Sequence, residues 1–294
     1  MGHLSRWRAN EFGKAAFLWN RRIRKTLVIQ SDYAGLGDHL FLSHIPRIAK
    51  TTGDLEKVYV SRRSPFRDGA QRSLIWESNP YVDGFVDAGG WPISMPHTDD
   101  QLPSKKLSWL CRLGLENRIL ELDAGCNLLD QIMLKMGLED GIRFHDPEVF
   151  VKITKREEFK SLTVYDPNFI TNAGVLSEAD VETYFRDNAV CVDAQMASRN
   201  KSLELRGVNR KIRTETLEDF CSLIVSCKEL YCLTTGTATL AAALGKPCTV
   251  LYGSGVNRLY HHSKLHRYVC LSGKNGSSPE EIKQTGEPAE PLKN

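Results

Sequence analysis

Short runs of β-branched and aliphatic residues alternate with helix-like segments along most of the chain, and this alternation constrains the fold more than any single motif. The runs read as buried strands at residues 26–32, 57–62, 161–167, 189–195, 229–235 and 247–253. Strands separated by helices pair in parallel and are covered by helices on both faces. The order therefore predicts an α/β protein made of two blocks, each with a parallel sheet and a Rossmann-like chain path.

The break between the two blocks falls near residue 150, in the stretch RFHDPEVFV. A chain of 294 residues is long enough for two domains, each with a core of its own. Residues 90–108, rich in proline and polar residues, are predicted to form a long loop. The predicted parts of the chain are a basic helix (1–24), an N-terminal Rossmann-like domain (25–150), a C-terminal Rossmann-like domain (151–272) and a flexible tail (273–294).

The composition narrows the class of protein. Hydrophobic residues make up 41% of the chain and charged residues 26%, as in soluble globular proteins. No apolar run approaches the roughly 20 residues that span a bilayer, and the sequence MGHLSRWRAN does not have the apolar core of a signal peptide. The eight cysteines include no CxxC pair, which favours free thiols in a reducing compartment. We therefore expect a cytoplasmic protein.

The N-terminal segment is strongly basic. Residues 1–26 hold seven lysines and arginines against a single acid, Glu11, and apolar residues that include Trp7 and Trp19 recur there at roughly helical spacing. Such a helix either lies on an anionic membrane surface, at the inner face of the membrane, or packs on the first domain. The rest of the chain has no matching basic stripe, so nucleic acid is not an expected partner.

The turn after the first strand reads DYAGLGDHL at residues 32–40 and admits three interpretations. A dinucleotide fingerprint needs a third glycine, where this chain has Leu40, and an acid about 20 residues on, where it has arginines. An NADP-dependent oxidoreductase, with those arginines on a 2′-phosphate, stays open. The second interpretation is a tight turn in which Gly35 and Gly37 adopt positive φ. In the third, Asp38 is a catalytic carboxylate.

A second strand–turn–helix of the same kind lies further along the chain. Small and hydroxyl-bearing residues cluster where its helix begins, namely Thr234, Thr235, Gly236, Thr237 and Thr239. Backbone N–H groups and the positive end of the helix dipole favour a phosphate there, although a threonine-capped helix without a ligand explains the same residues. Open α/β sheets bind ligands at the carboxyl ends of their strands. The two turns are therefore predicted to line one cleft.

Both turns resemble the heptosyltransferase family (glycosyltransferase family 9), whose members are two-domain GT-B glycosyltransferases. The G-x-G-D-x-L turn of that family is matched by Gly35-Leu36-Gly37-Asp38-His39-Leu40. Its D-[TS]-G-P-x-H-x-A-A-A-L-G-x-P phrase is matched by Thr234 through Pro247. NPYVDGFVD at 79–87 and the helix TLEDFCSLIVSCKEL are also similar, so the resemblance extends over residues 26–255.

The resemblance implies an inverting glycosyltransferase that moves a sugar from a nucleotide-sugar donor to a saccharide or lipid-linked acceptor in cell-surface glycan or lipopolysaccharide synthesis. Asp38 would be the general base, and we expect the helix end beside it to favour its ionised form. No DxD pair of carboxylates is evident, so neither a metal ion nor another cofactor is expected. The expected substrate- and donor-binding residues are Gly35, Gly37, His39, Thr234, Thr235, Gly236, Thr237, Thr239, Asn257 and Arg258.

The chain also departs from the family pattern. Thr234, Thr237 and Thr239 stand where the family has Asp, Pro and His, and no lysine follows the strand at 161–167. These departures leave the donor sugar open and keep a further alternative, a non-catalytic relative that binds a nucleotide or sugar without turnover. Tyr260-His261-His262 and His266 have no Cys or carboxylate in register, so a zinc site is not expected.

Overall fold

The computed structural model describes most of the predicted α/β region. The described residues are 24–52, 55–87, 91–93, 126–136, 138–169, 173–185, 192–196, 201–205, 211–256 and 260–271. The predicted N-terminal helix up to residue 23, the predicted tail, Asn257 and Arg258 lie outside these ranges. Within them, no helix combines the length and the apolar character needed to cross a membrane.

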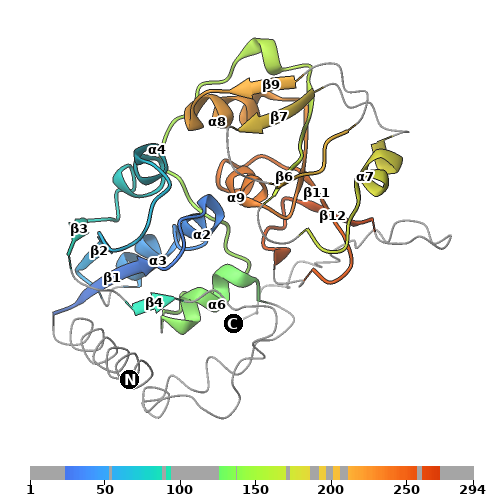
Figure 1. The fold of residues 1–294 in the computed structure, drawn as a ribbon. Coiled ribbons are helices and arrows are strands. Elements are labelled where there is room, and N and C mark those ends of the chain that lie inside the picture. The colour runs from blue at the N-terminus through green and yellow to red at the C-terminus, as the bar shows by residue number, and fades with distance from the viewer. Residues whose placement is uncertain are drawn as a thin grey trace, which may run out of the picture.

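The first half of the chain forms a parallel four-stranded sheet in the order β3-β2-β1-β4 (Figure 1). Its strands are β1 (Thr26–Ser31), β2 (Lys57–Ser61), β3 (Gly84–Val86) and β4 (Trp91–Ile93). The helices are α2 (Leu36–Leu40), α3 (Ile45–Thr51), α4 (Gly69–Arg72), a π-helical turn that continues it (Ser73–Glu77) and α6 (Leu128–Lys135). The central strand β1 buries Leu27 and Ile29 almost completely, which explains its apolar sequence.

The second half forms a parallel six-stranded sheet in the order β12-β11-β10-β5-β7-β9. Its strands are β5 (Thr163–Asp166), β7 (Val192–Met196), β9 (Lys211–Thr214), β10 (Glu229–Leu233), β11 (Thr249–Tyr252) and β12 (Arg267–Cys270). The helices are a 3₁₀ turn (Glu157–Phe159), α7 (Glu178–Phe185), α8 (Leu217–Ser226) and α9 (Gly236–Ala243). A small antiparallel pair joins β6 (Asn168–Phe169) to β8 (Lys201–Ser202).

Several helices begin where a side chain satisfies the free N–H groups of the first turn. Asn127 accepts from the backbone N–H of Asp130 at the start of α6, and the Asp130 side chain accepts in return from the Asn127 N–H. The predicted cap Ser177 accepts from the N–H of Asp180 at 3.3 Å. Thr216 does the same for Asp219 at the start of α8. These caps fix the helix starts that the sequence indicates.

The predicted α/β class with parallel sheets is confirmed, but the strands β4, β9 and β12 were not predicted. Residues 91–93, placed in the predicted loop, form β4 and pair with β1, with Trp91 opposite Ile29. Pro92 is compatible with this because β4 is an edge strand. The strand at 247–253 was expected to be the last, but β12 follows it at the edge of the second sheet. β12 begins with the exposed Arg267 and has only two fully buried positions, so its sequence carries a weak strand signal.

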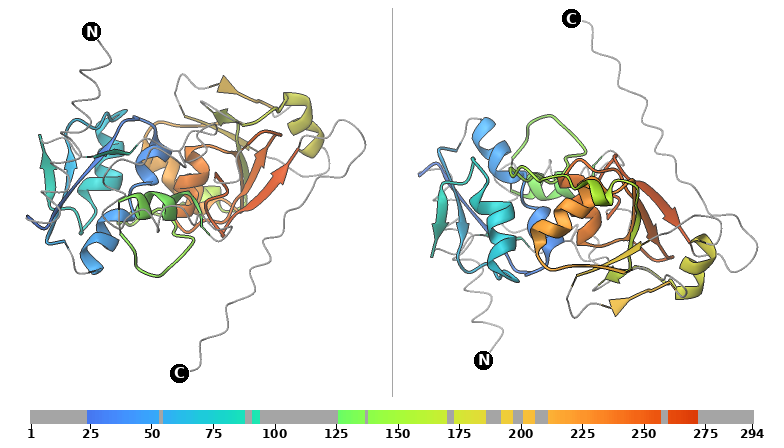
Figure 2. Two further views of the ribbon diagram at one scale, coloured as in Figure 1. Left: turned by 90° about the horizontal axis from the view of Figure 1, so that it is seen from below. Right: turned by 90° about the horizontal axis from the view of Figure 1, so that it is seen from above.

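The two sheets lie on opposite sides of the described structure, and the helices α2, α6 and α9 lie between them (Figure 2). One continuous hydrophobic cluster includes Leu27 of β1, Ile132 of α6 and Leu240 of α9. The closest approach joins α2 to α9. A Cβ placed on Gly37 would lie 3.2 Å from the Cα of Gly236, so the two helices meet backbone to backbone at their glycines.

Candidate active site

Asp38 lies in the first turn of α2, just beyond the carboxyl end of β1. Its carboxylate accepts a hydrogen bond from the backbone of Gly35 and so folds back over the turn. A Cβ on residue 35 would lie 2.2 Å from Asp38 Oδ2, so any side chain there would displace the carboxylate. Gly35 thus makes room for the position that Asp38 occupies.

The interpretation in which Gly35 and Gly37 adopt positive φ was wrong. Gly35 has φ −67°, and Gly37 is not among the glycines with positive φ. Gly37 is needed instead for the close approach of α2 to Gly236, and Gly35 for the Asp38 carboxylate. Both roles depend on contacts that a turn pattern does not contain.

Burial raises the pKa of Asp38. Loss of hydration raises its pKa above the usual value of 3.8, while the Gly35 hydrogen bond and the Arg67 charge oppose the rise. The net rise in the pKa of Asp38 is opposite to the expectation that the helix end favours the ionised form. A carboxylate with raised proton affinity is a stronger base than a solvated one.

One tyrosine and one arginine, Tyr260 and Arg67, lie within electrostatic reach of this carboxylate. The pKa of Tyr260 is raised by burial first and then by Asp38 and Tyr33. The backbone N–H of Arg67 donates to Gln71 Oε1 at 3.0 Å, and Gln71 Nε2 donates to the Gly35 carbonyl at 3.2 Å. The buried Gln71 therefore ties the Arg67 segment to the Asp38 turn. No sequence signal identified Gln71 or Tyr260, because both act through tertiary contacts.

The His39 side chain, next to Asp38 in α2, is held by packing and by hydrogen bonds within the protein. Its ring is fully buried and stacks on Phe66 with centroids 4.6 Å apart. The Trp76 indole N–H donates to His39 Nδ1 at 3.1 Å, so Nε2 carries the proton and donates to the Pro65 carbonyl at 2.8 Å. Burial lowers the pKa of His39, which keeps the ring neutral. Both ring nitrogens of His39 are therefore engaged inside the protein, and its predicted contact with a ligand stays a prediction.

The threonines of the second turn are also turned inward. Thr235 caps α9 by accepting from the N–H of Thr237 at 3.3 Å. The Thr237 hydroxyl donates to Asp166 at the end of β5, and the Thr239 hydroxyl to the Thr235 carbonyl at 3.5 Å. Only 6% of Thr237 and 1% of Thr239 are exposed, and both hydroxyls form hydrogen bonds within the protein. The contact of these two residues with a donor stays a prediction. Thr234, Thr235 and Gly236 are only partly buried.

A carboxylate of the chain itself lies beside the first turn of α9. Asp166 is 3% exposed and accepts from the backbone N–H and the side-chain amide of Asn168, at 3.1 and 2.7 Å, as well as from Thr237. The positive end of the helix dipole stabilises this buried negative charge. The same field was predicted to hold a phosphate, so a bound phosphate would have to share it with Asp166.

Two loops cross at the carboxyl edge of the second sheet. The N–H of Gly253 donates to the Ala173 carbonyl at 2.6 Å, and the N–H of Val175 donates to the Ser254 carbonyl at 2.9 Å. Gly174 has φ +79°, and a Cβ on it would lie 2.4 Å from the Gly253 carbonyl oxygen. The crossing therefore requires glycine at 174, and it closes one side of the edge at which ligands of such sheets bind.

The histidines near the C-terminus serve the packing. His261 stacks on Tyr268 with ring centroids 4.2 Å apart, and Nδ1 of His262 lies 3.0 Å from the Tyr260 carbonyl. His266 Nε2 lies 2.8 Å from the Ala238 carbonyl of α9. The described ranges contain no group of three or more His, Cys, Asp or Glu side chains arranged to hold a metal ion. These rings hold the segment that carries Tyr260 against the two helices of the site.

No protein-family model matches the chain, and no curated protein sequence matches it. Among solved structures, it is similar to the dodecameric iron-containing glycosyltransferase TibC from enterotoxigenic E. coli H10407, with 9% identity, 82% of this chain and 61% of that chain covered, and a TM-score of 0.54. A structure of TibC in complex with ADP-D-β-D-heptose shares 8% identity with this chain, with 82% of this chain and 61% of that chain covered and a TM-score of 0.53. The chain is also similar to E. coli ADP-heptose LPS heptosyltransferase II, with 15% identity, 84% of this chain and 91% of that chain covered, and a TM-score of 0.50. At these identities the similarity establishes a shared fold, and this chain spans about 61% of the length of TibC.

Proposed function

We propose that this protein is an inverting glycosyltransferase that moves a sugar from a nucleotide-sugar to a saccharide or glycolipid acceptor. The observation that carries the proposal is the partly buried Asp38 carboxylate, which lies at the end of β1 next to the Gly37–Gly236 contact with the second half of the chain. The GLGDHL turn that holds it matches the heptosyltransferase family, and the fold is shared with TibC, which has been solved with ADP-D-β-D-heptose.

In the proposed reaction the acceptor hydroxyl attacks the anomeric carbon of the donor. Asp38 takes the hydroxyl proton as the new C–O bond forms, and the bond between the anomeric carbon and the diphosphate oxygen breaks. The electron pair leaves with the nucleoside diphosphate. One displacement of this kind inverts the anomeric configuration. We propose that the reaction requires no metal ion.

The donor diphosphate is proposed to contact the backbone of the 234–236 turn, whose residues are only partly buried. Backbone N–H groups at a helix start stabilise a leaving diphosphate. Arg258, outside the described residues, is proposed to contact the donor phosphate. Asn257 beside it is proposed to contact the donor as well.

A second candidate function is favoured by the inward-facing threonines. The hydroxyls of Thr237 and Thr239 form hydrogen bonds within the protein, and the Asp166 carboxylate already lies beside the first turn of α9. A relative that binds a nucleotide or a sugar without turnover fits this arrangement too. The two candidates differ in turnover and in whether Asp38 matters.

Nucleotide binding separates these candidates from an NADP-dependent oxidoreductase. We expect one of ADP, GDP, UDP, CDP or CMP to raise the melting temperature, because a ligand at 100 times its Kd adds about 2.7 kcal/mol of stability. A thermal-shift panel of these five with NADPH measures this. A response to NADPH alone would refute the transferase, and a response to none of the six would remove the support for donor binding.

We also propose that residues 1–24 hold the protein at an anionic membrane surface, where a lipid-linked acceptor would be met. The support is the basic, tryptophan-bearing sequence of the segment. Co-sedimentation with vesicles that contain anionic lipid is expected to fall when these residues are removed, and to remain low with neutral vesicles. Equal sedimentation before and after removal would reject this part.

A further inference from the structure

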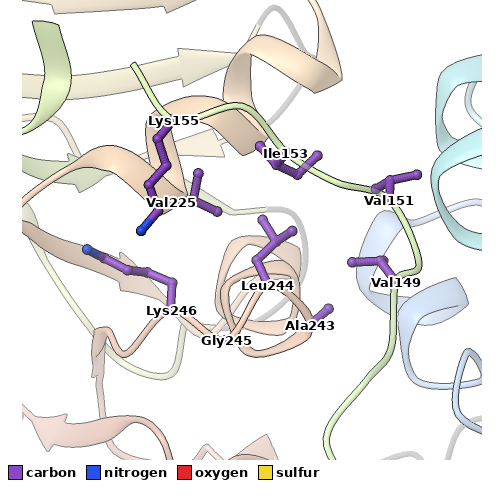
Figure 3. A pocket seen from close by; sticks show the side chains of 9 residues that line it. All are labelled: Val149, Val151, Ile153, Lys155, Val225, Ala243, Leu244, Gly245 and Lys246. Atoms are coloured by element: carbon purple, nitrogen blue, oxygen red, sulfur yellow. The ribbon is translucent and has the colours of Figure 1, made fainter. Parts of the chain in front are cut away.

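A pocket of about 500 Å³ lies away from Asp38, at the opposite end of α9 from the Gly37–Gly236 contact (Figure 3). It lies between the extended segment that connects the two halves and the ends of α8 and α9. Its volume falls in the range of about 300–1,000 Å³ that is typical of ligand sites. The lining residues are Val149, Val151, Ile153, Lys155, Val225, Ala243, Leu244, Gly245 and Lys246.

The connecting segment lines the pocket with alternate residues. Val149, Val151, Ile153 and Lys155 all contribute, as expected for an extended chain whose side chains point alternately to its two faces. Lys152 belongs to the other face and is exposed. The segment therefore presents three aliphatic side chains in a row to the pocket, followed by one ammonium group.

The pocket is divided into an apolar part and a cationic part. Figure 3 shows Lys155 and Lys246 toward one end and Val149 and Val151 toward the other. Lys246 Nζ donates to the Cys227 carbonyl and, at 3.4 Å, to the Lys228 carbonyl, which leaves one of its three N–H groups. Among the described residues, Lys155 has no hydrogen bond or ion pair, so its ammonium group is free for a ligand.

We propose that this pocket binds an alkyl phosphate monoester, with the chain along the aliphatic wall and the phosphate between the two lysines. Burial of the alkyl chain against valine, isoleucine and leucine side chains supplies apolar contact. A phosphate monoester carries about −1.5 to −2 charges at neutral pH. This charge matches the two ammonium groups better than the single negative charge of a carboxylate ligand would. The site is independent of the proposed sugar transfer, since none of its lining residues belongs to the Asp38 site.

The probe is decyl phosphate below its micellar concentration, titrated calorimetrically into the full-length protein. Decanol, which has the chain without the charge, and inorganic phosphate, which has the charge without the chain, are the matched ligands. We expect one molecule of decyl phosphate per chain and much weaker binding of the other two. Equal binding of inorganic phosphate or of decanol would overturn the proposed division of the pocket.

Two substitutions place the site. Lys155→Gln is expected to weaken decyl phosphate binding about tenfold, the loss of one partly screened charge-assisted hydrogen bond. Val151→Ser is expected to weaken it as well, and Lys152→Gln, on the opposite face of the same segment, to leave it unchanged. All three positions are at least partly exposed, so folding is retained and checked by melting temperature. Wild-type affinity in both Lys155→Gln and Val151→Ser, or an equal loss in Lys152→Gln, would overturn the proposal.

Discussion

Replacing Asp38 with asparagine is expected to lower the rate of sugar transfer by about 10²–10⁴-fold, the usual contribution of a positioned general base. The amide keeps the shape of the side chain and an oxygen that can accept from Gly35, but it cannot take up the acceptor proton. Nucleotide binding should persist, since the loss concerns proton transfer. Steady-state rates with the donor identified by the nucleotide panel measure the effect.

The same substitution should not destabilise the protein. Burial raises the pKa of Asp38 in the folded state, so folding at pH 7 disfavours the charge that the unfolded chain carries. Removing that charge should leave the free energy of unfolding equal or higher. Asp68→Asn is the matched control, because Asp68 caps α4 by accepting from Gln71 N–H and asparagine caps equally well. Full turnover in Asp38→Asn, or an equal loss in Asp68→Asn, would contradict the role of Asp38 as base.

Acid is expected to destabilise the protein through two buried histidines. Burial, with smaller contributions from neighbouring histidines, lowers the pKa of His44 and of His262 to about 3. The unfolded chain takes up these protons near pH 6.5, so the stability that each neutral ring contributes is complete above 6.5 and is lost as the pH falls toward 3. At pH 5 each ring should therefore cost about 2 kcal/mol relative to pH 7.

A double variant isolates this effect from the other titrating groups. His44→Gln keeps a nitrogen that can reach the Leu129 carbonyl, and His262→Asn keeps one that can reach the Tyr260 carbonyl. His145, whose pKa its two carboxylate partners raise against the effect of burial, is present in both proteins. Urea unfolding between pH 5 and pH 7 should show a smaller loss of stability in the double variant, by about 4 kcal/mol. Parallel pH curves for the two proteins would refute the assignment.

The sequence predicted much of the fold because buried parallel strands carry their own signal. LVI at 27–29 and LYCL at 230–233 are apolar runs in strands that lie in the middle of their sheets. The edge strands β4, β9 and β12 escaped prediction because β4 contains a proline, and β9 and β12 carry exposed charged residues such as Arg213 and Arg267. Edge strands have fewer buried positions, so their sequences are less constrained.

The candidate site was predicted less completely. The sequence singled out the turn of Asp38 and the start of α9, and the structure brings these two turns together through Gly37 and Gly236. It could not indicate that the hydroxyls of Thr237 and Thr239 point inward, because a capping threonine and a ligand-binding one look alike in sequence. The raised pKa of Asp38 likewise comes from burial between elements far apart in the chain.

The most direct test of the central claim is the anomeric configuration of the transferred sugar. With the donor selected by nucleotide binding and a saccharide acceptor, proton NMR of the first product reports whether the configuration at the anomeric carbon has changed. Inversion is expected, since Asp38 serves as the base in a single displacement. Retention of configuration, or transfer that proceeds equally well in Asp38→Asn, would contradict it.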